Sequence, residues 1–266
     1  MKHLSALLIT LFFTSPVFAQ LATPNAAGLT YGHVHLNVSD MDLHKRLWVE
    51  HFNGTVVERG PLTVVKLPNM MVALTNREPT GGSRGTVMDH FGFKVRSIEN
   101  FLAKWRRAGY EVGSEFIGSE GQKNAYIMMP DDVYVELQED QSLHVEIMGY
   151  HIHFRTEGHE DLLAWYTDLF SLEVRPRGRI ETTTNAPGMN LSFANSNEPR
   201  TGTRGTSIDH IGFEFDDLEA FCKELEAKGI VFDVPFRDIP SIGLKIAYIT
   251  DPNGVYIELT EGYDEY

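Results

Sequence analysis

The chain has 266 residues, 42% of them hydrophobic, which is enough to bury a substantial core in one or two domains. It carries 23 basic and 37 acidic residues, a formal net charge of −14. This acidity argues against nucleic acids and anionic membrane surfaces as partners, because both attract clusters of lysine and arginine. Cys222 is the only cysteine, so no intramolecular disulfide can form, and we expect it to be a small core residue.

The first 19 residues have the pattern of a secretory signal peptide. Lys2 gives a positive start, Leu4 to Phe13 is an apolar run, and Ala19 stands where signal peptidase cuts. The run is shorter than the ~18 apolar residues that a membrane-spanning helix needs, and no later stretch reaches that length. We therefore predict cleavage after Ala19, a linker over residues 20–30, and a secreted or periplasmic protein without a membrane partner.

Residues 31–140 predict strands and helices in a repeating order. Tyr31–Val38 alternates like a strand, and Met41–Phe52 has apolar residues at helical spacing after a candidate N-cap at Ser39 or Asp40. Three short strands follow, and the cycle then begins again at Asp89. The predicted later segments are strands Thr55–Glu58, Leu62–Leu67, Met70–Asn76 and Asp89–Val95, helix Ile98–Ala108, and strands Tyr110–Phe116, Asn124–Met129 and Val133–Gln138.

Residues 145–262 repeat the first half, with helices predicted near His159–Phe170 and Leu218–Lys228. The offset between matched residues grows from 151 − 33 = 118 through 210 − 90 = 120 to 258 − 136 = 122, as short loop insertions after a duplication would produce. We infer a tandem duplication with a polar junction at residues 139–142. The matched segments are His33-Val34-His35 with His151-Ile152-His153, Arg84-Gly85-Thr86 with Arg204-Gly205-Thr206, Asp89-His90 with Asp209-His210, and Glu136 with Glu258.

Two motifs of the second half identify a family resemblance. Asp209-His210-Ile211-Gly212-Phe213, and the turn Asp251-Pro252-Asn253-Gly254 before the strand that carries Glu258, resemble the vicinal oxygen chelate superfamily. Its members include glyoxalase I, bleomycin-binding proteins and extradiol ring-cleaving dioxygenases. The resemblance implies an α+β fold of four βαβββ modules, arranged as two tandem glyoxalase-like half-barrel domains over residues 31–140 and 145–262.

The resemblance also implies metal ligands on the first and last strands of the modules. Two imidazoles and one carboxylate on neighbouring strands can occupy one face of an octahedral ion and leave positions open for substrate. We therefore expect a divalent ion, Fe, Mn, Zn or Ni, in one or both halves. The implied ligands are His33, His90 and Glu136 in the first half and His151, His210 and Glu258 in the second.

Two questions about this ligand set stay open from the sequence. His33 and His35 lie on one face of a strand, as do His151 and His153, so either member of each pair can be the ligand; the family register favours His33 and His151. The fourth family position is empty, because Ala73 and Ser192 stand where a carboxylate would be. Three ligands favour a dioxygenase-like arrangement over a glyoxalase-like one.

Two tyrosines, Tyr126 and Tyr248, are candidate catalytic residues. Each stands ten residues before its Glu, where ring-cleaving dioxygenases place a tyrosine against the substrate, and a phenol can donate a hydrogen bond there. The acid–base histidine of those enzymes has no counterpart here. We therefore expect a metal-dependent lyase, isomerase or dioxygenase for a small substrate with vicinal oxygens. The alternative is a non-catalytic small-molecule binding protein, and a homodimer is left open.

Overall fold

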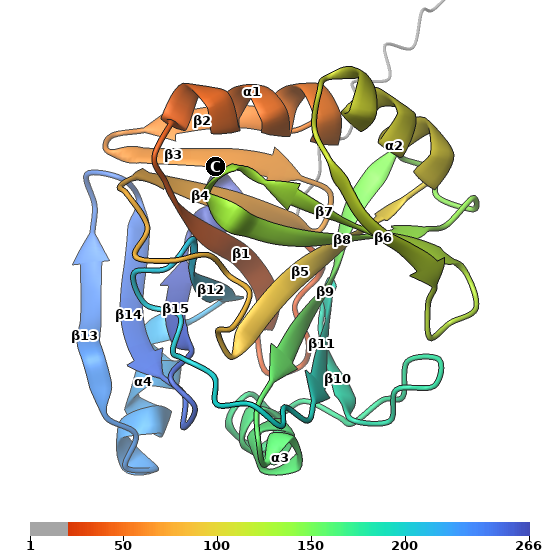
Figure 1. Cartoon of the computed structure of the whole chain (residues 1–266). Coiled ribbons are helices and arrows are strands. Elements are labelled where there is room, and N and C mark those ends of the chain that lie inside the picture. Colours follow the sequence, from red (N-terminus) through yellow and green to blue (C-terminus); the bar gives the residue numbers. More distant parts are fainter. Residues whose placement is uncertain (1–20) are drawn as a thin grey trace, which may run out of the picture.

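The computed structural model describes residues 21–266 and contains two β-sheets with four helices at their periphery (Figure 1). The predicted signal peptide lies outside the described residues. Among residues 21–266, no helix is both long enough and apolar enough to cross a membrane. The first strand begins at Leu29, so the predicted linker ends two residues earlier than expected.

Four modules follow one another along the chain, which confirms the predicted α+β organisation. The first module comprises β1 (Leu29–Val38), α1 (Met41–Phe52), β2 (Thr55–Arg59), β3 (Leu62–Leu67) and β4 (Met70–Asn76). The second comprises β5 (Met88–Val95), α2 (Ile98–Arg107), β6 (Val112–Ile117), β7 (Lys123–Met129), the 3-10 turn η1 (Pro130–Asp132) and β8 (Val133–Glu139). The third comprises β9 (Ile147–Arg155), α3 (His159–Leu169), β10 (Thr183–Ala186) and β11 (Met189–Ala194). The fourth comprises β12 (Ile208–Phe215), α4 (Leu218–Ala227), β13 (Phe232–Ile239), β14 (Leu244–Thr250) and β15 (Tyr256–Glu261), and the 3-10 turn η2 (Tyr263–Glu265) follows it.

The third module is shorter than the others, which corrects the expectation of four equal repeats. Between α3 and β10 only isolated bridges remain, at Val174–Thr184 and Arg177–Ile180. Pro176 lies in this segment and has no N–H to donate to a ladder, and Gly178 adopts a positive φ of 57°. The segment therefore forms a loop in place of a full strand, and this loop carries Arg177 inward.

The sheets combine modules in a way that the sequence halves do not indicate. The eight-stranded sheet has the order β13-β14-β15-β12-β1-β4-β3-β2, so it joins the first and fourth modules; we term it sheet 1/4. The seven-stranded sheet has the order β10-β11-β9-β5-β8-β7-β6 and joins the second and third modules; we term it sheet 2/3. Each sheet therefore contains strands from both halves of the sequence.

The helix-side cores, in contrast, join modules within one half. Phe52 of α1 packs on Phe93 of β5 with ring centroids 5.1 Å apart, and Phe170 beside α3 packs on Phe213 of β12 at 4.5 Å. Burial of such large rings is the main stabilising contribution of this layer. Cys222 of α4 is buried in the same core, as expected. Because the helices cover this face of the strands, the alternate side chains of β1, β5, β9 and β12 are left to line the opposite face.

Two glycines in the central strands allow histidines to lie flat across the sheet. In sheet 1/4, Gly212 of β12 is opposite His33 of β1, and a Cβ on this glycine would lie 2.0 Å from the imidazole Cε1 of His33. In sheet 2/3, Gly92 of β5 is opposite His151 of β9, and its Cβ would lie 2.2 Å from Cε1 of His151. The repeated Asp-His-x-Gly-Phe motif therefore provides both a histidine and the space for its partner.

Candidate metal centres and their surroundings

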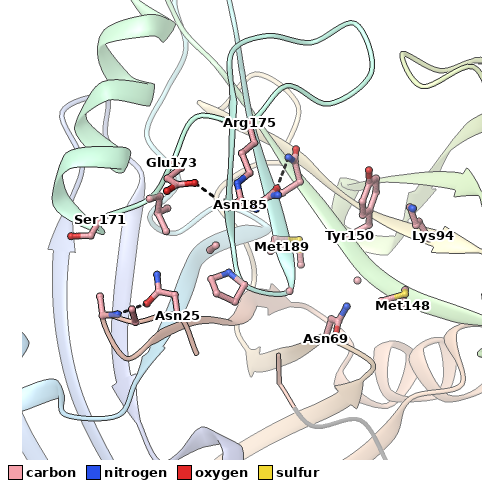
Figure 2. A pocket seen from close by; sticks show the side chains of 18 of the residues that line it. Asn25, Asn69, Lys94, Met148, Tyr150, Ser171, Glu173, Arg175, Asn185 and Met189 are labelled. Atoms are coloured by element: carbon pink, nitrogen blue, oxygen red, sulfur yellow. Dashed lines mark hydrogen bonds and ion pairs between the residues drawn. The ribbon is translucent and has the colours of Figure 1, made fainter. Parts of the chain in front are cut away.

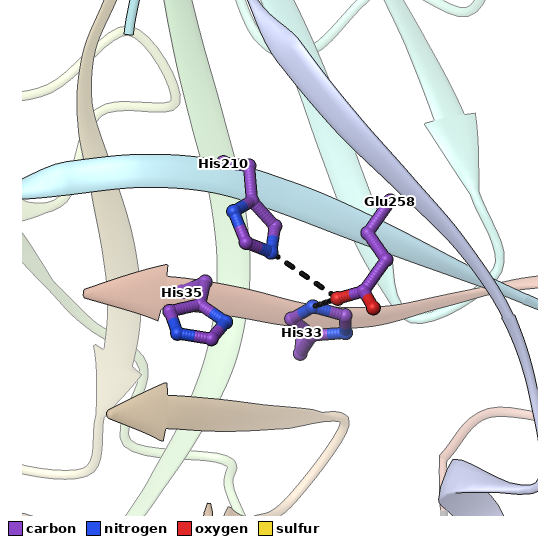
Figure 3. Close-up of side chains that lie close together, drawn as sticks. All are labelled: His33, His35, His210 and Glu258. Carbon is purple, nitrogen blue, oxygen red and sulfur yellow. Dashed lines mark hydrogen bonds and ion pairs between the residues drawn. The ribbon is translucent and has the colours of Figure 1, made fainter. Parts of the chain in front are cut away.

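The first candidate centre lies at the middle of sheet 1/4, and we term it the His33 cluster (Figure 3). Nε2 of His33 lies 2.9 Å from Oε2 of Glu258, and Nε2 of His210 lies 3.2 Å from the same oxygen. The fourth member makes a different contact, because Nε2 of His35 is 2.7 Å from the hydroxyl of Thr75. The members are His33 and His35 of β1, His210 of β12 and Glu258 of β15; one donor atom from each lies within 4.8 Å of the others.

The second candidate centre lies at the middle of sheet 2/3, and we term it the His90 cluster. Nε2 of His90 and Nε2 of His151 lie 2.9 Å and 3.1 Å from Oε2 of Glu136. The other carboxylate oxygen, Oε1, accepts a hydrogen bond from the side-chain amide of Asn124. The members are His90 of β5, Glu136 of β8, and His151 and His153 of β9, again with donor atoms within 4.8 Å of one another.

The clusters contain all six implied ligands, but the grouping by sequence half is wrong. His33 lies with His210 and Glu258, whereas His151 lies with His90 and Glu136. The reason is strand pairing: β1 pairs with β12, and β5 pairs with β9, so each pair crosses from one half to the other. The sequence contains no local signal for this exchange.

The fourth family position lacks a carboxylate, as the sequence predicts. Ala73 of β4 is the register partner of His35, and Ser192 of β11 is the register partner of His153. Neither small side chain can supply a charged oxygen ligand. In each cluster a further histidine, His35 or His153, lies next to this small side chain. Each cluster therefore has four potential donors, and three of them are imidazoles.

The donor set of both clusters fits a divalent metal ion. Nδ1 of His90 lies 3.0 Å from Asp89, and Nδ1 of His210 lies 2.6 Å from Asp209. An imidazole that donates through Nδ1 and gives up its Nε2 proton to a binding ion presents the lone pair of Nε2 to the centre of its cluster, as metal-binding histidines with a carboxylate partner do. His33 is fully buried; its Nδ1 has no hydrogen-bond partner among the described residues, and its Nε2 lies 2.9 Å from Oε2 of Glu258. An ion in the centre would give Nε2 of His33 a partner.

The charges of the clusters are strongly coupled to their surroundings. Burial opposes protonation of His210, but its hydrogen bonds to Asp209 and Glu258 raise its pKa to about 9. Burial similarly lowers the pKa of His151 to about 4, although Glu136 partly opposes this shift. The imidazoles next to Glu136 and Glu258 hold the pKa of each carboxyl well below its usual range, despite burial. Both carboxylates are therefore ionised at neutral pH, as metal ligands must be.

The two candidate catalytic tyrosines lie beside the clusters. The ring centroid of Tyr126 is 5.2 Å from that of His90, and the centroid of Tyr248 is 5.5 Å from that of His210. Burial, together with the neighbouring glutamate, raises the pKa of each phenol far above its usual range. Both phenols are therefore neutral and can act as hydrogen-bond donors.

Arg177 was not found by sequence reasoning, and it contacts the His90 cluster. Its Nη2 lies 2.9 Å from Nε2 of His153, and its Nη1 lies 3.5 Å from Oε2 of Glu120 and 3.4 Å from Oε1 of Gln138. His153 is therefore engaged by a guanidinium group, which leaves His90, His151 and Glu136 as the free donors. The sequence signal nearest to this contact is Pro176, which interrupts the strand. It predicts a loop, but it does not predict that the loop places Arg177 against His153.

Tyr263 was also missed, and it covers the His33 cluster. Its ring is tilted over that of His33 with centroids 4.7 Å apart, and it is almost completely buried. Backbone N–H groups of Gly262 and Tyr263 donate to Oε1 of Glu214 at 2.5 Å and 2.9 Å, which anchors the segment. Figure 1 accordingly shows the C-terminal end near β4.

Two cavities flank sheet 2/3. One of about 700 Å³ lies on the Tyr126 side of the His90 cluster and includes Asp89, the partner of His90, in its wall. The other, of about 850 Å³, has no cluster residue in its wall and lies between the segment at Asn25, β9 and the β10–β11 hairpin (Figure 2). In its wall Arg175 pairs with Glu173 and Asn185 accepts a hydrogen bond from Asn190. The smaller cavity is therefore the one next to candidate chemistry.

Comparison with known proteins supports this architecture. The family model described as Glyoxalase/Bleomycin resistance protein/Dioxygenase superfamily matches residues 30–137 and 150–259. The structure of glyoxalase I from Zea mays is similar with a TM-score of 0.68 and 15% identity, over 89% of this chain and 94% of that chain. A putative dioxygenase from Bacillus subtilis has a TM-score of 0.66 and 12% identity, over 92% of this chain and 86% of that one. A search of curated proteins finds no match.

The two segments matched by the family model together cover most of the sequence. The chain therefore belongs to the glyoxalase/bleomycin resistance protein/dioxygenase superfamily.

Proposed function

We propose that the protein is a divalent-metal-dependent enzyme that acts on a small substrate with vicinal oxygens, in a lyase, isomerase or dioxygenase type of reaction. One observation carries the proposal: in each cluster two histidine Nε2 atoms and one glutamate oxygen converge, and Asp89 or Asp209 orients one histidine from behind. A bound ion would polarise the substrate oxygens as a Lewis acid.

We assign catalysis to the His90 cluster because a cavity lies beside it. His90, His151 and Glu136 would hold the ion, and Asn124 fixes the carboxylate through its second oxygen. The phenol of Tyr126 stands in the cavity wall next to His90, where it can donate a hydrogen bond to a substrate oxygen that becomes negatively charged. Arg177 holds the ring of His153, and its charge is balanced by Glu120.

We assign a structural role to the His33 cluster. It has the same three donors, His33, His210 and Glu258, but the ring of Tyr263 lies over His33. A substrate would have to displace a buried tyrosine to reach this centre. Secretion, predicted from the first 19 residues, is part of the proposal and places the substrate outside the cytoplasm.

Metal content and turnover together test the proposal. Protein purified without chelators is assayed by elemental analysis, and small vicinal-oxygen compounds such as α-hydroxyketones and catechols are screened for turnover before and after metal removal. His90→Ala is expected to lose one ion and all turnover, whereas His210→Ala is expected to lose one ion and retain turnover. A wild-type protein that binds no Fe, Mn, Zn or Ni even after reconstitution would reject the enzyme and favour the non-catalytic binding protein.

A further inference from the structure

The cavity beside the His90 cluster is rich in arginine. Its wall contains Arg84, Arg155 and Arg200, two stacked tyrosines with ring centroids 4.6 Å apart, and Asp89. Two further carboxylates in the wall, Asp132 and Glu198, belong to exposed residues, as does Arg84. Arg155 and Arg200 are only partly exposed. Both contact Asp89, the partner of His90, so they lie nearer to the cluster than Arg84 does.

One carboxylate is shared between these two inner guanidinium groups. Nη1 of Arg200 donates to Oδ1 of Asp89 at 2.9 Å, and its Nε donates to Ser196 at 2.9 Å. Nε of Arg155 lies 3.7 Å from Oδ2 of Asp89, and within residues 21–266 its side chain makes no hydrogen bond. The inner wall therefore has an excess of positive charge and unused donors, in a chain whose net charge is −14.

The other half of the duplication shows that the fold does not require these arginines. The counterpart of Arg155 is Asn37, which donates to Oδ2 of Asp209 at 3.0 Å. The counterpart of Arg200 is Thr80, which donates to the carbonyl of Gly205 at 3.0 Å. In sheet 1/4 the neutral Asn37 thus holds the equivalent aspartate, and Thr80 holds the neighbouring loop without contacting it. The arginines of sheet 2/3 add charge beyond that structural task.

We propose that the cavity beside the His90 cluster recognises an anionic substrate, a carboxylate or a phosphate ester, through Arg155 and Arg200. The inference rests on the proposed function for its link to turnover, but the binding step can be measured alone. Guanidinium groups bind both anions through paired, charge-assisted hydrogen bonds. The rim carboxylates of Asp132 and Glu198 are exposed, so water and salt screen their repulsion.

The test replaces each arginine by the residue that its counterpart already uses. The double variant Arg155→Asn/Arg200→Thr and the wild type are titrated by calorimetry with inorganic phosphate, with succinate, and with neutral succinamide. Arg204→Gln is the matched control, because Arg204 stacks on Tyr256 at 4.5 Å in the other half, as Arg84 stacks on Tyr134 at 4.9 Å. Metal content of each protein is measured in parallel.

We expect wild type and Arg204→Gln to bind at least one of the two anions saturably. The double variant should lose about tenfold or more of this affinity, and none of the proteins should bind succinamide. Preference for phosphate or for succinate then identifies the source of the charge. Equal affinity in wild type and double variant, or no saturable binding by wild type, would overturn the inference.

Three further variants separate this result from the proposed function and from misfolding. His90→Ala lacks a metal ligand but keeps both arginines, so it should retain the anion affinity even if the enzyme proposal fails. If the double variant does not fold, Arg155→Lys and Arg155→Asn are compared instead. Lysine keeps the charge and should lose less affinity than asparagine; equal loss would contradict recognition of charge.

Discussion

The His33 and His90 clusters have the same ligand types in the same register, yet they differ in how accessible they are and in the charges around them. Tyr263 covers the first cluster, whereas a 700 Å³ cavity lies beside the second. Asn37 stands near Asp209 where Arg155 stands near Asp89. The duplication therefore retained the donor atoms and changed the access and the charge around them. Four experiments test this difference between the clusters.

The largest effect is expected from removal of one carboxylate ligand. Three donors share a binding free energy on the order of 10 kcal/mol, so Glu136→Gln should weaken metal binding at the His90 cluster on the order of 1,000-fold. Glu258→Gln should do the same at the His33 cluster only. Competition with a chromophoric chelator measures both sites. Loss of both ions from either single variant would show that the clusters are not independent.

Removal of the cover should expose the His33 cluster. Tyr263 is buried and its ring packs on His33 and Tyr266, so Tyr263→Ala should lower the free energy of unfolding by about 3 kcal/mol. Metal release from this cluster to a chelator should also become faster, while release from the His90 cluster stays unchanged. Urea denaturation and stopped-flow chelation measure the two quantities. An unchanged release rate would contradict the role of Tyr263 as a cover.

Asn124 distinguishes the carboxylates of the two clusters. It donates to Glu136, whereas its counterpart in the other half is Ile246, which cannot donate. Asn124→Ile should therefore weaken metal binding at the His90 cluster by about 10-fold to 100-fold, in the range seen for residues that orient a ligand. The same chelator competition applies. Ile246→Val, a small apolar change at the matched position, is the control and should leave both affinities as they are.

The smallest expected effect is on the pH dependence of the free energy of unfolding, and it arises at the segment that carries Tyr263. Burial raises the pKa of Glu214 to about 7, although hydrogen bonds from Thr260, Gly262 and Tyr263 partly oppose it. The folded carboxyl binds a proton more tightly than the unfolded one, so its contribution to stability is complete below pH ~4.5 and is lost as the pH rises to about 7.

Wild type should thus lose on the order of 1 kcal/mol of this contribution between pH 4.5 and pH 7. Glu214→Gln should remove this part of the slope, which urea denaturation at a series of pH values can measure. The counterpart position is Lys94, which pairs with Asp140 at 2.8 Å. A slope of unchanged size in Glu214→Gln would exclude Glu214 as its source.

Local sequence patterns were sufficient to predict the helices, the strands and the residue types of the site. Helix α1 begins and ends at the predicted residues, because Asp40 caps its first turn and accepts a hydrogen bond from the N–H of Leu43. The strands of the first half agree within two residues, because alternating and helical patterns of apolar residues are local signals. The repeated His and Glu positions likewise predicted six of the eight donors in the two clusters, and His35 and His153 were named as alternatives to His33 and His151.

Which donors meet, and what surrounds them, depends on the pairing of strands and loops that are far apart in the chain. His33 joins His210 because β1 pairs with β12 across the two halves, and backbone hydrogen bonds between distant strands leave no local mark in the sequence. Arg177 reaches His153 from a loop, and Tyr263 reaches His33 from the segment after β15. Such contacts arise from packing of segments far apart in the chain, so residue spacing alone cannot predict them.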